Sequence, residues 1–105
     1  MNERAGTPTF LVEHYWPGVT ADGFREAAER VRLSAAEIAA TETEIRFLHS
    51  TLVPEDEAAF CVFAASSSEI VVEAYRRAGV QFERILDALE MTCLAGSAEP
   101  RKEQT

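Results

Sequence analysis

The chain alternates between two kinds of apolar pattern in an order that few folds can accommodate. Residues 9–16 form an aromatic and β-branched run that ends at Pro17-Gly18, which is typical of a strand followed by a turn. Beyond Thr20, apolar residues recur at steps of three and four. This spacing predicts a helix that begins near Ala21, is capped by Thr20 and is buried on one side.

The middle of the chain predicts two strands joined by a short connector. In residues 44–53, Ile45 and Phe47 lie on one side of the alternation, whereas residues 58–65 are mostly apolar throughout. Pro54 heads the polar segment between the two runs. Because the connector is so short, the two strands are expected to form a hairpin.

A second helix and a last strand complete the pattern. Ser66 and Glu69 have the Ser-x-x-Glu spacing of a capping box, which predicts a helix start. Gly79 can supply the left-handed residue that ends this helix. A final strand is expected from about Arg84 to Met91.

The order strand–helix–strand–strand–helix–strand predicts an α+β fold. Right-handed crossovers place the first and third strands at the centre of a four-stranded antiparallel sheet, with two helices on one face. This is the ferredoxin-like βαββαβ arrangement, named for its topology, because two cysteines cannot hold an iron–sulfur cluster. We expect one domain over residues 9–91, between a flexible N-terminus (1–8) and a disordered tail (92–105).

The charge balance excludes several classes of partner. Eighteen acidic residues against ten basic ones give a net charge of −8, which argues against nucleic-acid binding.

No run approaches the roughly 20 apolar residues that a membrane span requires. The first residues have no apolar stretch that could serve as a signal peptide, so a cytoplasmic protein is expected.

Two helices on one face leave the other face of the sheet open. Phe10 and Val12 of the first strand are expected to face the helices, together with Phe60, Val62 and Ala64 of the third. The open face is then expected to hold Leu11, Glu13, Tyr15, Leu48, Ser50, Cys61, Phe63, Ile85, Asp87 and Leu89. So apolar a face predicts an interface, and two sheets packed about a two-fold axis would form a dimeric α+β barrel.

The polar residues of this expected face are the candidates for a site. Glu13 and Cys61 are the preferred metal ligands, because same-face residues on neighbouring strands come within reach and because a thiolate and a carboxylate suit a borderline metal. A buried core thiol is the alternative for Cys61. His14 and His49 are secondary candidates, with His49 on the Phe47 side by alternation. His14 is expected to point to the opposite face from Glu13. The alternative to a metal ligand is a partly solvated histidine near a strand end.

Short motifs resemble a family of small actinobacterial proteins that includes a nickel-binding protein with a ferredoxin-like fold. The motifs are residues 10–18, 60–63, 75–79 and 84–85. The family pattern Phe-Leu-Val-Glu-x-Tyr-x-Pro-Gly is met in full, and Phe63 replaces the tyrosine of Cys-x-Tyr. Where relatives often carry a histidine in the second helix, this chain has Tyr75, which removes one candidate ligand. The resemblance implies nickel or another divalent transition metal as the cofactor.

The leading hypothesis is a non-enzymatic homodimer that binds a divalent metal or a small ligand on its open sheet face. Tyr15, Phe63 and Asp87 are the further candidates for contacting a ligand. One alternative is a cofactor-independent enzyme of the dimeric α+β barrel type, with Glu13 as the base in a cavity lined by Tyr15, Trp16 and Phe63. The other is a pure interaction module. No catalytic residue is assigned.

Overall fold

The computed structural model describes residues 6–91 and has the predicted order of elements. These are β1 (Thr9–Tyr15), α1 (Ala21–Ala39), β2 (Ile45–Val53), the short 3-10 helix η1 (Pro54–Asp56), β3 (Ala58–Ala65), α2 (Ser68–Ala78) and β4 (Arg84–Ala88). The last strand ends at Ala88, three residues before the predicted end at Met91. The tail predicted for residues 92–105 lies outside the described residues, as do the first five residues of the predicted N-terminal segment.

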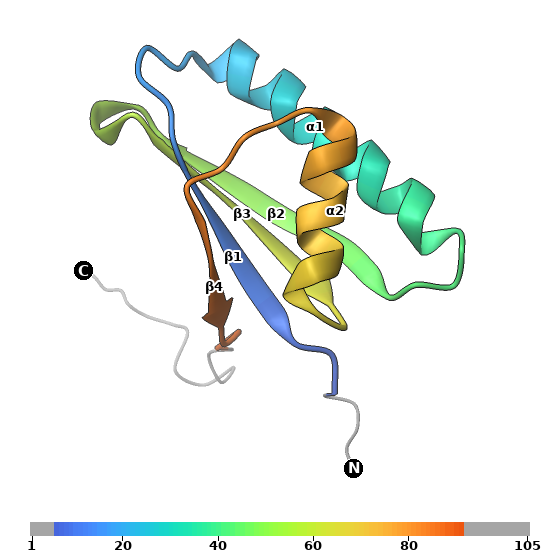
Figure 1. Ribbon diagram of the computed structural model, residues 1–105. Helices are drawn as coiled ribbons and strands as arrows, with labels where there is room; N and C mark the ends of the chain where they lie inside the picture. The colour runs from blue at the N-terminus through green and yellow to red at the C-terminus, as the bar shows by residue number, and fades with distance from the viewer. Residues whose placement is uncertain (1–5, 92–105) are drawn as a thin grey trace, which may run out of the picture.

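The four strands form one antiparallel sheet in the order β2-β3-β1-β4, with β1 and β3 at the centre as predicted. Both helices cross the same face of this sheet (Figure 1). The hairpin between β2 and β3 turns through η1, and Glu57 after it adopts a left-handed conformation with φ 52°. The predicted α+β fold with two helices on one face is therefore confirmed.

Local signals fix the helix ends, with one exception. The side chain of Thr20 accepts a hydrogen bond from the backbone N–H of Gly23 at 3.0 Å and caps α1 as predicted. Gly79 ends α2 with φ 70°, a conformation that glycine adopts without steric cost. The prediction of a capping box at Ser66 and Glu69 is wrong, because the N-cap of α2 is Ser67 and its side chain makes no capping hydrogen bond.

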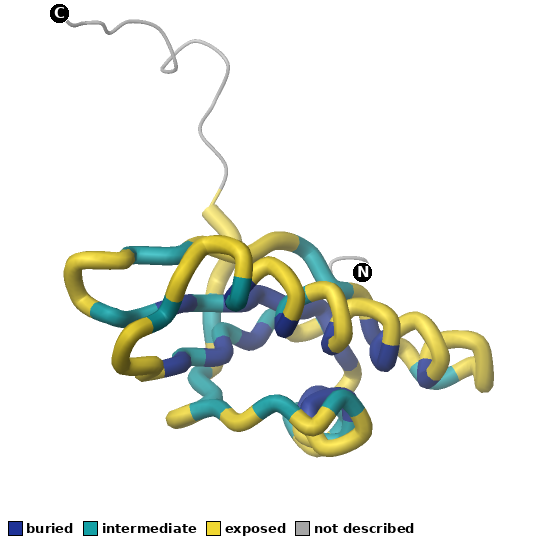
Figure 2. Tube along the Cα trace, turned by 90° about the horizontal axis from the view of Figure 1, so that it is seen from above, coloured by how far each residue is buried: buried dark blue, intermediate teal, exposed yellow. Residues whose placement is uncertain are grey.

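The core lies between the sheet and the helices. Val12 from β1, Phe63 from β3 and Val71 from α2 are fully buried within it. Figure 2 shows buried stretches on the inner side of the fold, while the outer turns of the helices and the loops are exposed. One apolar face of each helix is thus covered, and burial of this kind is the main favourable contribution to folding.

No helix within residues 6–91 is both long and apolar enough to cross a membrane.

Candidate functional site

The face of the sheet away from the helices, called the open face below, has a different composition from the predicted one. Residues paired directly across neighbouring strands lie on the same face. Leu11 pairs with Val62 and with Leu86, and Glu13 pairs with Phe60. By this pairing the open face holds Thr9, Leu11, Glu13, Tyr15, Arg46, His49, Thr51, Ala58, Phe60, Val62, Ala64, Arg84 and Leu86, so the predicted places of Leu11, Glu13 and Tyr15 are confirmed.

The predicted orientation of β3 is wrong. Cys61 pairs with Val12 and Phe63 pairs with Phe10, so both face the helices, and both are fully buried. Every residue of β3 is apolar, so its own alternation cannot show which side is inward. The neighbouring strand β1, with its polar Glu13, determines the orientation instead. Glu13 and Cys61 therefore lie on opposite faces of the sheet, and the structure does not bring this preferred pair together.

An irregularity in β2 moves His49 to the open face. The register shifts between Phe47, which pairs with Phe63, and His49, which pairs with Val62. Such a β-bulge inserts one extra residue and reverses the side-chain alternation beyond it. His49 thus lies opposite to its predicted side and is exposed, while Ser50 faces α1.

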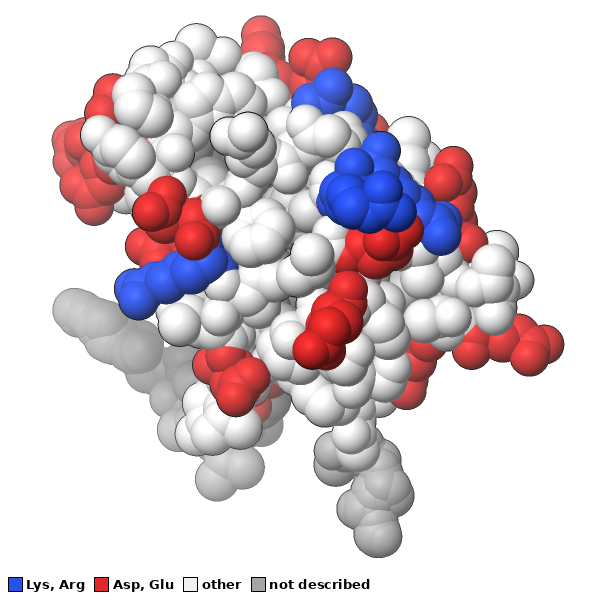
Figure 3. All heavy atoms as spheres, viewed as in Figure 1, with Lys and Arg blue, Asp and Glu red and all other residues white. Residues whose placement is uncertain are grey.

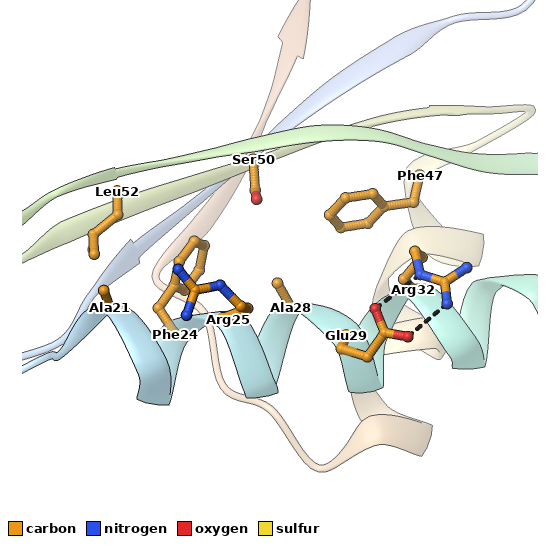
Figure 4. Close-up of a pocket in the computed structure, with 9 residues that line it drawn as sticks. All are labelled: Ala21, Phe24, Arg25, Ala28, Glu29, Arg32, Phe47, Ser50 and Leu52. Atoms are coloured by element: carbon orange, nitrogen blue, oxygen red, sulfur yellow. Dashed lines mark hydrogen bonds and ion pairs between the residues drawn. The ribbon is translucent and has the colours of Figure 1, made fainter.

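Ser50, which was predicted on the open face, instead lines a groove between α1 and β2. Ser50, Leu52 and Phe47 point from β2 toward α1 (Figure 4). The groove encloses about 360 Å³. The charges of α1 along it are paired within the helix, since Arg32 binds Glu29 in two hydrogen bonds and Arg25 binds Asp22. No unpaired charge is left among these residues to recognise a polar ligand.

Glu13 has an ion-pair partner on the open face. Its Oε1 accepts a hydrogen bond from Nε of Arg84 at 2.5 Å, and the two residues are direct partners between β1 and β4. The carboxylate is therefore satisfied by a cation of its own chain. Local patterns gave no sign of this pair, because Arg84 lies 71 residues away.

His14 is buried on the helix side, where both of its ring nitrogens are engaged. Nδ1 lies 2.9 Å from the carbonyl oxygen of Ala59, which can only accept, so Nδ1 donates. Nε2 lies 2.9 Å from the Tyr75 hydroxyl and accepts from it, since burial lowers the pKa of His14 and keeps the ring neutral. The prediction of a partly solvated His14 is therefore wrong.

Cys61 lies beside the same tyrosine hydroxyl in the core. Burial raises the pKa of the Cys61 thiol to about 11, and burial also raises the pKa of Tyr75. His14, Tyr75 and Cys61 form a neutral polar cluster, called the buried polar cluster below. A neutral thiol and a histidine with both nitrogens hydrogen-bonded are not prepared to bind a metal ion. The hydrogen-bonding role of Tyr75 in this cluster was not predicted from the sequence.

The three remaining ligand candidates are not brought together. Tyr15 is exposed at the end of β1, whereas Asp87 pairs with Phe10 near the start of that strand. Phe63 is fully buried on the helix side of the sheet, and its ring lies edge-to-face with that of Phe47, with the ring centroids 5.1 Å apart. Ile85 and Asp87 pair with Val12 and Phe10, so both lie on the helix side and not on the open face as predicted. Leu89 lies just beyond the end of β4.

The donor side chains that the structure describes do not make a metal centre within one chain. Within residues 6–91, no group of three or more His, Cys, Asp or Glu side chains could hold a metal ion. His49 and Glu13, the two potential ligands on the open face, are separated by the intervening strand β3. Neighbouring strands lie about 4.8 Å apart, so these two side chains belong to different parts of the face.

Comparison with known proteins supplies the family. Residues 10–87 match the family described as "Nickel responsive protein SCO4226-like". The crystal structure of SCO4226 from Streptomyces coelicolor A3(2) is similar in fold, with a TM-score of 0.64 and 19% sequence identity over 80% of this chain and 99% of that one. The comparison with curated proteins gives no match. Because the match covers most of the chain, this protein belongs to the SCO4226-like family of nickel-responsive proteins.

Proposed function

We propose that the chain works as a homodimer that pairs through its open face and binds Ni²⁺ with ligands from both copies. The observation that carries the proposal is a sheet face with an apolar centre that no helix within residues 6–91 covers, with His49 and Glu13 on either side of that centre.

The apolar residues of the open face support pairing with a second copy. Leu11, Val62 and Leu86 lie in a row across β3, β1 and β4, and Phe60 lies next to them on β3. Leu11, Phe60 and Leu86 are half-buried in the single chain, and Val62 is buried among them. Contiguous apolar surface of this kind commonly marks an interface, and a two-fold dimer lets one patch cover itself. Arg46, Thr51 and Arg84 would form a polar rim around it.

The family description and the donor chemistry support nickel. Imidazole and carboxylate groups suit Ni²⁺, and a two-fold dimer doubles each donor by bringing a second His49 and a second Glu13 to the same interface. His14 and Cys61 are left out of this ligand set because the buried polar cluster holds them on the other face. Glu13 would have to exchange its Arg84 partner for the metal.

Dimer formation is tested by sedimentation velocity on tag-free protein, because a histidine tag would itself bind nickel. We expect a dimer that Leu86→Glu converts to a monomer, since a buried unpaired charge opposes association. Leu33→Glu is the matched control, because Leu33 is an exposed leucine on α1, away from the sheet. A wild-type monomer at all concentrations, or a dimeric Leu86→Glu variant, would contradict the interface.

Nickel binding is tested by isothermal titration of metal-free protein. His49→Ala is expected to abolish saturable Ni²⁺ binding and Glu13→Gln to weaken it, whereas Glu55→Gln on η1 removes a similar charge away from the open face. Unchanged affinity in both His49→Ala and Glu13→Gln would refute the ligand assignment. A dimer without saturable Ni²⁺ binding would leave the interface proposal intact and refute the metal proposal.

A further inference from the structure

A second concave surface lies on the helix side of the sheet, along the other side of α1 from the α1–β2 groove. This surface, called the end cleft below, is bounded by the end of β1, the middle of α1 and the loop after α2, and it encloses about 370 Å³. Trp16, Pro17, Arg30, Gly79 and Val80 line it, and His14 lies at its floor. Its volume is within the usual range for small-molecule sites.

The walls of the end cleft are fixed by backbone hydrogen bonds. The N–H of Trp16 donates to the carbonyl of Glu57 at 2.8 Å, and the carbonyl of Trp16 accepts from Val19 at 3.1 Å. On the other side, the N–H of Val80 donates to the carbonyl of Tyr75 at 3.2 Å. A cleft held in this way is formed before a ligand arrives, which lowers the entropic cost of binding.

The charge of the cleft is opposite to that of the protein. No Asp or Glu lines it, although the chain has eighteen acidic residues and a net charge of −8. Arg30 lines it and, among the residues that the structure describes, has no carboxylate within ion-pair distance. Figure 3 shows basic side chains over α1 and the end of α2 with acidic ones beside them, and Arg76 and Arg77 at the end of α2 both pair with Glu73.

The other groups in the cleft are flat, apolar or neutral. Trp16 presents a partly exposed aromatic face, with Pro17 and Val80 beside it. His14 is neutral and has both ring nitrogens occupied, so it offers no charge to a ligand. The space behind Trp16, toward Cys61 and Tyr75, is only about 10 Å³ and closes the cleft to anything larger than a water molecule.

We propose that the end cleft binds a small aromatic carboxylate, whose ring packs on Trp16 and whose carboxylate pairs with Arg30. Guanidinium and carboxylate match in geometry and form charge-assisted hydrogen bonds. Aromatic rings gain from packing against an indole in addition to the area they bury. The site is separate from the open face, so it does not depend on nickel binding or on the proposed dimer interface.

The test uses metal-free full-length protein labelled with ¹⁵N. Trp16 is the only tryptophan of the chain, so its indole N–H gives one unambiguous resonance at the cleft. We expect a saturable shift of this resonance with benzoate, and much weaker binding of benzamide, which has the same ring without the charge. Arg30→Gln is expected to weaken benzoate binding by about tenfold or more, the loss that corresponds to one charge-assisted hydrogen bond.

Arg25→Gln is the matched control. Arg25 is an exposed arginine on α1 that does not line the cleft, so its replacement changes the net charge equally without touching the cleft. Its affinity for benzoate should equal that of wild type. Absence of a saturable shift, equal affinities for benzoate and benzamide, or equal losses in Arg30→Gln and Arg25→Gln would each overturn the proposal.

Discussion

The hydroxyl of Tyr75 on α2 donates a hydrogen bond to Nε2 of His14 on β1, across 61 residues of chain and inside the core. This contact joins the two halves of the fold, and burial lowers the pKa of the histidine, which keeps its ring neutral. The ring can accept from Tyr75 only while it is neutral, and the backbone carbonyl of Ala59 holds the proton on Nδ1.

Tyr75→Phe is expected to destabilise the protein by about 1–3 kcal/mol, because it leaves a buried histidine nitrogen without a partner. Urea denaturation measures the change. Tyr15→Phe removes the same hydroxyl from an exposed tyrosine and should change the free energy of unfolding by less than about 0.5 kcal/mol. Equal effects of the two substitutions would show that the hydrogen bond with His14 contributes nothing.

Stability should fall as the pH is lowered below about 6.5. Burial lowers the pKa of His14 in the folded protein, so between the folded and unfolded pKa values the unfolded chain binds more protons. This contribution is complete above the unfolded pKa and is lost toward the folded pKa, with a slope of up to about 1.4 kcal/mol per pH unit. Denaturation curves between pH 5 and 7.5 measure it, and His14→Gln should flatten them in this range.

Cys61 should be unreactive toward thiol reagents in the native protein. Burial raises its pKa to about 11, so the thiolate that reacts is scarce at pH 8, and the side chain is fully buried. A Cys93→Ser variant isolates Cys61 for measurement with a chromogenic disulfide reagent. Labelling should occur only as fast as the protein unfolds and should accelerate with urea. Rapid stoichiometric labelling without urea would contradict the buried position.

Glu13→Gln should leave stability almost unchanged. The ion pair of Glu13 with Arg84 lies at the surface, and the Arg84 side chain is 62% exposed, so solvent screens the attraction. The midpoint of urea denaturation is expected to stay close to that of wild type at both low and high salt. A large loss of stability would show that Glu13 is required for folding, and its effect on nickel binding would then need a different variant.

The sequence was sufficient for the elements and their order because those signals are local. The helix cap at Thr20, the left-handed end at Gly79 and the turn at Pro54 each act within a few residues. The side of the sheet to which β3 residues point was not predictable, because an all-apolar strand has no alternation to read. The bulge after Phe47 could not be predicted from the sequence either, because it depends on pairing between β2 and β3.

The sequence by itself therefore determined the βαββαβ order and the presence of one uncovered sheet face. Only the tertiary structure decided which polar residues occupy that face, because strand pairing and a single bulge set the direction of every side chain beyond them. The tertiary structure places Cys61 in the core and His49 on the open face. It also assembled two arrangements from distant segments, the buried polar cluster and the end cleft, for which no local pattern exists.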